Sequence, residues 1–348
     1  MTATCFPHAS LDAHVAQEMT HTLYCTPAWL DLITRIYGSS ALPLTSTNAS
    51  RRVTGYLPLC FIQSRVTGRR LVSLPFSDHC PLLAADEASA TDLVDQAILL
   101  AQEKRAKYLE LRAGVNDVLA RRSDLVTSDL YVRWLKPLTP DSDALWRSVD
   151  GSVRRAIKKA ERLAVHVRIA QDRAEMEHFY RLHLLTRNKK LGMPAQPRRY
   201  FFALWDTFAL SGAMQLWLAE QQGVVVAGSI FLASGTTVQL AYSASDARYQ
   251  HVRAVNRLLW MAMQWASTHG YDMFDLGRTA RDNPGLMRFK RHMGATMEPL
   301  PYYYYPRTAG LAATSERSWK YRLLTGCWRR LPLRVAAPLG GLLYKHLG

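Results

Sequence analysis

The chain has 348 residues, of which 48% are hydrophobic and 21% are charged. These fractions are ordinary for a globular protein and exclude a disordered chain, and the length predicts about two domains. The formal net charge of +16 is not ordinary, and it predicts an anionic partner (tRNA, the phosphates of a nucleotide cofactor or an acidic membrane surface) unless it is only a solubilising coat.

The first half alternates between helical and extended patterns. Residues 27–37 predict a helix that Gly38 ends, and residues 52–63 and 70–75 predict extended runs. A helix at 91–104 follows. Directly after it, residues 108–112 (YLELR) form an apolar strand that places an acid and then an arginine at its end.

The second half begins after residues 138–141 (LTPD), a short linker with turn-forming residues, which predicts a domain boundary near residue 140. Helices are expected from residue 144 and at 152–163, 173–191 and 200–210, and extended runs at 213–220, 224–234 and 236–243. Short turns join these runs, so they predict an antiparallel meander. An apolar helix at 252–268, a strand at 273–276, a helix at 284–292 and a last strand at 296–305 complete this half.

Residues 274–278 (FDLGR), 283–286 (NPGL) and 289–294 (FKRHMG) carry a resemblance to known proteins. This pattern resembles the second half of the FemABX-like aminoacyltransferases and the BioF2-type acetyltransferases, which are relatives of the GNAT superfamily. The element order is that of a GNAT domain, and the YLELR strand suggests that the first half repeats it.

The resemblance implies an α+β fold of tandem GNAT-like (acyl-CoA N-acyltransferase) domains with mixed, largely antiparallel sheets and flanking helices. The expected parts are an N-terminal domain (1–140), a C-terminal domain with the donor site (141–306) and a basic amphipathic extension (307–348). The implied reaction moves an acyl or aminoacyl group from acyl-CoA or aminoacyl-tRNA to an amine of a cell-envelope or polysaccharide precursor. The alternative is a non-catalytic, degenerate GNAT-like protein that binds anionic lipid or RNA.

Asp275 and Lys290 are the candidate catalytic residues. A carboxylate at a strand end can orient or deprotonate an attacking amine, although a structural ion pair with Arg278 is the alternative. Lys290 stands at the position of the family's lysine, so the resemblance implies contact with the donor or with developing charge. Arg278 can bind a phosphate through two parallel hydrogen bonds.

The loop at 245–256 corresponds to the loop that holds the pyrophosphate in CoA-dependent GNAT enzymes, but its glycines are missing. Arg248, His251 and Arg253 can supply charge in their place. Asn256, on the first turn of the following helix, is either a polar contact to the donor or a helix cap. The missing glycines leave both a CoA thioester and a charged tRNA open as donors.

The acceptor side is expected around residues 73–80 (SLPFSDHC), which resemble an SLPFSD segment in the first domain of these relatives. Asp78 or His79 could bind or deprotonate an amine, and a plain turn is the alternative. The predicted substrate-binding residues are Phe76, Asp78, His79, Arg112, Arg187 and Tyr242. Arg154, Arg155, Lys158 and Lys159 could in addition track a phosphate backbone, or be only a solvated face. The expected partners are an amine-bearing small-molecule or lipid-linked precursor and tRNA.

The tail at 307–348 interleaves basic residues with Trp and Leu. It is either a helix in a membrane interface or a helix packed on the second domain. The five cysteines are scattered and form no C-x-x-C pair, so neither a metal nor a disulfide framework is expected. The sequence has no signal-peptide pattern and no apolar run long enough to span a membrane, which predicts a cytoplasmic location, either soluble or peripheral at the inner face of the membrane.

Overall fold

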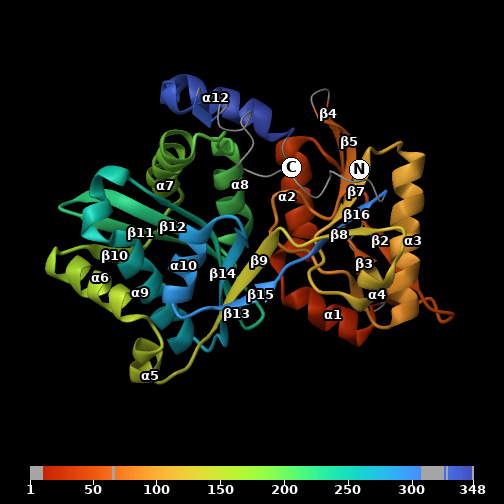
Figure 1. The fold of residues 1–348 in the computed structure, drawn as a ribbon, viewed down its shortest axis with the longest axis horizontal. Coiled ribbons are helices and arrows are strands. Elements are labelled where there is room, and N and C mark those ends of the chain that lie inside the picture. Colours follow the sequence, from red (N-terminus) through yellow and green to blue (C-terminus); the bar gives the residue numbers. More distant parts are fainter. Residues whose placement is uncertain (1–10, 65–66, 307–324, 327, 347–348) are drawn as a thin grey trace.

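The computed structural model describes residues 11–64, 67–306, 325–326 and 328–346. Two lobes lie side by side, and one further helix lies above them in the view of Figure 1. The first lobe contains the helices α1 (Ala13–Thr20), α2 (Pro27–Tyr37), α3 (Glu87–Glu103) and α4 (Asp117–Arg121). The second contains α5 (Ser142–Arg147), α6 (Gly151–Arg162), α7 (Met176–Leu184), α8 (Arg198–Phe208), α9 (Ala254–Thr268) and α10 (Pro284–His292). The further helix is α12 (Leu333–Tyr344).

The main sheet of the first lobe is mixed and has the strand order β1-β4-β5-β7-β16-β8. Its strands are β1 (Ser40–Ala41), β4 (Cys60–Ser64), β5 (Gly68–Val72), β7 (Tyr108–Leu111), β8 (Val126–Ser128) and β16 (Tyr302–Tyr305). A smaller sheet consists of β2 (Leu44–Thr47), β3 (Val53–Leu57) and β6 (Leu83–Ala84). The extended run expected at 52–63 is therefore two strands in different sheets, with Pro58, which has no N–H to donate, at the break.

The sheet of the second lobe has the order β10-β11-β12-β13-β14-β9-β15. Its strands are β9 (Tyr131–Pro137), β10 (His166–Ile169), β11 (Met214–Gln221), β12 (Val224–Ser234), β13 (Thr237–Ser245), β14 (Met273–Ala280) and β15 (Thr296–Pro299). The predicted meander is present as β11, β12 and β13, which pair antiparallel in sequence order.

Both lobes contain the same parallel unit, a strand, a helix and a parallel strand. In the first lobe β5 pairs parallel with β7 across α3, and in the second β13 pairs parallel with β14 across α9. All other strand pairings are antiparallel among the described residues. This duplication confirms the tandem GNAT-like fold class.

The lobes also exchange strands. β9 precedes the second lobe in sequence but pairs with β14, whereas β16 follows that lobe but pairs with β7 of the first. The prediction of a single strand at 296–305 is wrong. The segment forms β15 and β16, which belong to different sheets, and Pro301 lies between them. The boundary near residue 140 stays a prediction.

The helix expected at 173–191 is instead a short 3-10 turn, α7 and a π-helical segment (Leu185–Leu191) that ends at Gly192. The wider π turn places the Asn188 side chain in the interior, where it is fully buried. A periodicity argument cannot separate an α-helix from a π-helix over two turns.

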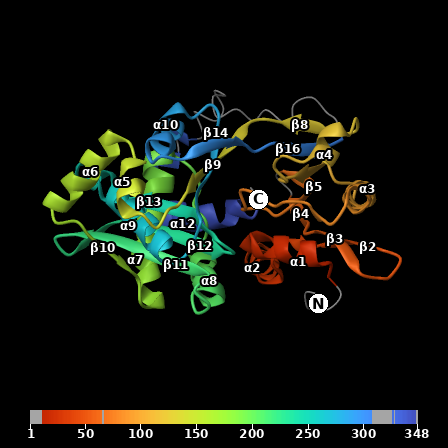
Figure 2. The same ribbon diagram turned by 90° about the horizontal axis from the view of Figure 1, so that it is seen from below.

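A shared hydrophobic core holds the lobes together. It contains Trp29 and Ile33 of α2 together with Phe201 and Phe208 of α8, and the Trp29 and Phe208 rings lie 5.9 Å apart. Figure 2 shows β8, β9 and β16 running along one side of the same junction. No helix in the described part of the chain is long and apolar enough to cross a membrane.

Candidate acyl-transfer site

Asp275 lies on β14 and is 1% exposed. Its Oδ2 accepts a hydrogen bond of 2.8 Å from Nε of Arg133 on β9, and its Oδ1 accepts one of 2.7 Å from the N–H of Gly277. Gly277 has a φ of +75°, which glycine adopts without steric cost. Burial raises the pKa of Asp275, and Arg133 and the Gly277 N–H oppose that rise. Both carboxylate oxygens are thus engaged in holding this bend in place.

Arg278 connects the two lobes. Its N–H donates to Oδ2 of Asp78 at 3.1 Å, and its Nε lies 3.4 Å from Oδ1 of the same carboxylate. Its Nη1 donates to Oη of Tyr302 at 2.8 Å, and its guanidinium lies 4.3 Å from the ring centroid of Tyr131. With 32% of its side chain exposed, Asp78 is more accessible to a substrate than Asp275.

Lys290 lies on α10 and is 5% exposed. Its Nζ donates hydrogen bonds of 2.9 Å to the carbonyl oxygens of both Gly277 and Arg278. Burial lowers the pKa of Lys290 to about 8, although Asp78 and Asp275 favour the charged form. Such an ammonium is mostly charged at neutral pH and gives up its proton more easily than an ordinary lysine.

These side chains form one group from both lobes, which we call the junction cluster. Its members are Asp78, Arg133, Asp275, Arg278, Lys290 and Tyr302. The cluster brings together three of the predicted residues of the second lobe and one of the first.

A cavity of about 750 Å³ lies beside Lys290. Its walls come from the end of β13, the 3-10 helix η5 (Ala247–Val252), the first turns of α9 and one face of α10. Arg253 and Asn256 line it, and their role in binding a donor stays a prediction. Arg253 has a φ of +60°, and no side chain caps the first turn of α9. The amide groups of that turn therefore have no side-chain acceptor, which suits an anion at the helix N-terminus.

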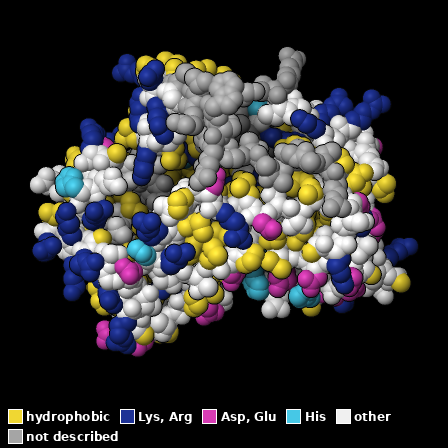
Figure 3. Space-filling model, in the orientation of Figure 1, with side chains coloured by type: hydrophobic (Ala, Val, Ile, Leu, Met, Phe, Trp, Pro, Cys, Tyr) yellow, Lys and Arg dark blue, Asp and Glu magenta, His cyan; other side chains and the backbone are white. Residues whose placement is uncertain are grey.

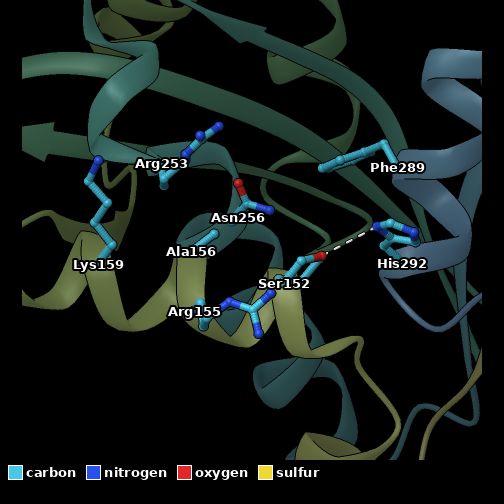
Figure 4. Close-up of a pocket in the computed structure, with 9 residues that line it drawn as sticks. Ser152, Arg155, Ala156, Lys159, Arg253, Asn256, Phe289 and His292 are labelled. Atoms are coloured by element: carbon cyan, nitrogen blue, oxygen red, sulfur yellow. Dashed lines mark hydrogen bonds between the residues drawn. The ribbon is translucent and has the colours of Figure 1, made fainter.

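A second cavity of about 390 Å³ adjoins the first, because Arg253, Asn256 and Phe289 line both. Figure 4 shows Arg155 and Lys159 of α6 on one side of it and His292 of α10 on the other. Ser152 and His292 make the hydrogen bond drawn there, with 3.4 Å between Oγ and Nδ1. The lining residues among the described part of the chain include no carboxylate, so this cavity is suited to phosphate.

Two other predicted donor residues are not among the residues that line the cavities. Arg248 pairs with Asp246, with 2.6 Å between Nη2 and Oδ2, and its side chain is 75% exposed. His251 is exposed, and its Nδ1 lies 3.2 Å from the carbonyl oxygen of Arg248. Neither residue lines a described cavity.

Phe76 and Tyr242 lie in an aromatic cluster that both lobes build. The Phe76 ring lies 4.1 Å from that of Tyr37 and 5.1 Å from that of Tyr344. Tyr242 and Tyr200 share a hydrogen bond of 2.9 Å between their hydroxyl groups, and the Tyr37 ring lies 5.7 Å from Tyr200. Phe76 precedes Asp78 by two residues in the chain, so the aromatic cluster borders the junction cluster.

Arg112 is buried and holds the 73–78 loop in place. It donates to Glu110 at 2.7 Å and to the carbonyl oxygens of Leu74 and Ser77 at 3.2 and 2.9 Å. Arg187 similarly donates from Nε to the carbonyl oxygen of Pro194 at 3.0 Å. These contacts position backbone, and a role for either side chain in substrate binding stays a prediction.

His79 is a poorer base than the sequence suggested. Burial lowers its pKa to about 4, and its Nε2 lies 3.0 Å from the carbonyl oxygen of Ala113. An imidazole of that pKa is neutral at physiological pH but accepts a proton weakly. Asp78 is therefore the better candidate on this loop for meeting an amine.

Sequence reasoning missed Arg133 and Tyr302. Arg133 pairs with Asp275 because β9 lies next to β14, and Tyr302 reaches Arg278 from the strand that follows the second lobe. The local signal that could have pointed to Tyr302 is the run of four tyrosines at 302–305, whose pattern by itself predicts only a strand. Among the described residues, no group of His, Cys, Asp and Glu is arranged to hold a metal ion.

Comparison with known proteins agrees with this architecture. Residues 147–291 match the family described as acetyltransferase (GNAT) domain. The structure is similar to that of FemX, with a TM-score of 0.66 and 16% identity over 84% of this chain and 95% of that one.

Two further solved structures have a similar fold. One is the C-terminal domain of a putative lysylphosphatidylglycerol synthetase from Agrobacterium fabrum (TM-score 0.55, 14% identity, 81% of this chain and 89% of that one). The other is L-PGS from Bacillus licheniformis (TM-score 0.54, 14% identity, 88% and 98%). No curated protein matches the sequence. The chain therefore has a tandem GNAT-like fold of the FemABX-like kind, and its GNAT acetyltransferase domain makes it an N-acyltransferase by class.

Proposed function

We propose that this protein transfers an acyl or aminoacyl group from a phosphate-bearing donor to an amine of a cell-envelope or polysaccharide precursor. The observation that carries the proposal is the position of Lys290. Lys290 lines the larger cavity, and its ammonium binds the two carbonyls that adjoin Asp78 of the other lobe. A donor carbonyl in the cavity and an amine at the junction would meet at this group.

In the proposed reaction the amine nitrogen attacks the donor carbonyl carbon. A C–N bond forms, and the C–S bond of a thioester or the C–O bond of an aminoacyl ester breaks with its electron pair remaining on sulfur or oxygen. The proton that the amine loses is passed on to this leaving group, which departs as a thiol or a hydroxyl. The protonated Lys290 would stabilise the negative charge that develops on the carbonyl oxygen. Asp78, with 32% of its side chain exposed, is accessible enough to receive the amine proton, whereas the buried Asp275 would position Gly277 and Arg133.

The two adjoining cavities support a donor that carries several phosphates. One phosphate would bind at the uncapped first turn of α9, beside Arg253. Another would bind between Arg155, Lys159 and His292 in the smaller cavity. Acyl-CoA and the 3′ end of an aminoacyl-tRNA both meet this requirement, and the similarity of fold to a putative lysylphosphatidylglycerol synthetase favours the second.

The test supplies purified protein with acyl-CoAs or with aminoacyl-tRNAs, together with soluble amine acceptors, and detects the amide product by mass spectrometry. We expect one donor class to give product, and Lys290→Ala to remove it. Lys104→Ala is the matched control, since Lys104 pairs with a neighbouring exposed glutamate away from both cavities. No product from either class, with folded protein, would overturn the proposal and favour the non-catalytic alternative.

A further inference from the structure

The helix α12 presents its large apolar side chains to solvent. Its buried residues are small or aromatic and recur every four positions: Ala336, Gly340 and Tyr344. On the other side Val335, Leu339, Leu342 and Leu343 are 44, 41, 60 and 38% exposed. Their spacing places them on one face of the helix, which therefore has an apolar stripe outside the core.

This orientation is fixed, because α12 is attached to both lobes. A Cβ added to Gly340 would lie 3.0 Å from backbone atoms of Ala195, so the helix lies directly against the second lobe. At its other end Tyr344 stacks on Phe76 of the first lobe, and the carbonyl oxygen of His346 accepts a hydrogen bond of 2.7 Å from Arg70. The outward face cannot turn inward without breaking these contacts.

The apolar stripe lies among positive charges. The segment 325–346 contains Arg329, Arg330, Arg334 and Lys345, all exposed, and no acidic residue. Lys189, on the π-helical segment beside α12, donates to the carbonyl oxygens of Arg329 and Leu331 at 3.1 and 2.8 Å. Figure 3 shows hydrophobic side chains along the top edge, where α12 lies, with Lys and Arg beside them.

We propose that α12 docks the protein on a membrane surface that contains anionic lipid. The leucines and valine would enter the boundary of the acyl chains, and the arginines and lysines would meet the headgroup phosphates. A second copy of the chain fits this face less well, because a two-fold contact would place the same positive charges opposite one another.

Docking would also bring the acceptor side close to the lipid. Tyr344 of α12 stacks on Phe76, two residues from Asp78, so the predicted acceptor residues lie under the docking helix. The inference that the acceptor is a lipid-linked amine rests on the proposed function. The membrane contact itself does not depend on it.

The experiment measures co-sedimentation of the full chain with phosphatidylcholine vesicles, with and without phosphatidylglycerol. We expect binding that requires phosphatidylglycerol. The double variant Leu339→Glu/Leu342→Glu should bind at least about a hundredfold more weakly, because two exposed leucines that would enter the lipid are replaced by charges. Leu210→Glu is the control, since Leu210 is a fully exposed leucine on the second lobe, remote from α12 in sequence.

Arg330→Glu/Arg334→Glu should weaken binding and reduce its dependence on phosphatidylglycerol. The proposal fails if the wild-type chain leaves both vesicle types unbound, or if Leu210→Glu weakens binding as much as the double variant. It also fails if sedimentation equilibrium shows a dimer that Leu339→Glu/Leu342→Glu dissociates, which would identify a second copy as the occupant. Thermal unfolding checks that each variant folds. Since no donor or acceptor is present, failure of the acyl-transfer proposal would leave this result unchanged.

Discussion

The buried ammonium of Lys290 makes a prediction about stability that needs no substrate. Burial lowers its pKa from 10.5 to about 8. The folded state therefore binds this proton more weakly than the unfolded state, and folding is penalised wherever the unfolded lysine is charged. A shift of that size corresponds to about 3 kcal/mol at neutral pH, since one pKa unit is about 1.4 kcal/mol.

The sign of the pH dependence follows from this shift. Between the folded pKa of about 8 and the unfolded value of 10.5 the unfolded chain holds more protons at this site, so stability rises with pH. The penalty falls by about 2.5 kcal/mol between about pH 7 and about pH 10. Other groups titrate in this range, so the quantity to measure is the difference between the wild type and Lys290→Met.

The assay is urea unfolding of both proteins at these two pH values. We expect the stability of the wild type, relative to Lys290→Met, to increase by about 2 to 3 kcal/mol on going to the higher pH. Lys104→Met serves as control, because Lys104 is on the surface, and it should show no such difference. A wild-type-minus-variant difference that does not change with pH would refute the reasoning and mean that Lys290 keeps an ordinary pKa.

Four further predictions concern the junction cluster and the neighbouring residue His79. Gly277→Ala should lower stability by about 2 kcal/mol or more and disturb Asp78, because the new Cβ would lie 3.1 Å from Oδ2 of Asp78 at a φ of +75°. Both stabilities are measured by thermal unfolding, with Gly223→Ala as the control, because Gly223 has a φ of +76° and open space around it, so this variant reports the cost of φ alone. Equal losses of stability in the two variants would mean that crowding against Asp78 costs nothing. Asp275→Asn should cost about 1 to 3 kcal/mol in urea unfolding, because it leaves the guanidinium of Arg133 without its charged partner, and an unchanged midpoint would mean that the ion pair contributes nothing. In NMR titration the His79 ring should stay neutral down to about pH 5, and a midpoint near 6.5 would contradict its burial. If the protonated Lys290 stabilises developing charge, kcat should fall as the pH rises through about 8, and a kcat that increases there would point to the neutral amine as the active form.

Local sequence alone determined much of the second lobe. The helix at 284–292 and the strand at 224–234 have the predicted bounds, since a proline at N1, turn glycines and hydrophobic periodicity are all local signals. The acid and arginine after α9, and the corresponding Glu110 and Arg112 after α3, revealed the duplication for the same reason.

The partners of these residues were decided only by the tertiary structure. Asp275 binds Arg133, 142 positions away, and Arg278 binds Asp78, 200 positions away, although the sequence had suggested Asp275 and Arg278 as a pair. The first contact depends on the order of strands in the second sheet, and the second depends on how the loop at Asp78 packs against β14. In addition, β9 and β16 each join a sheet from outside its sequence neighbourhood. Periodicity is a property of one element and carries no information about its neighbour. The sequence therefore supplied candidate side chains, and the order of strands and the packing of the two lobes determined which of them meet and which further residues join them.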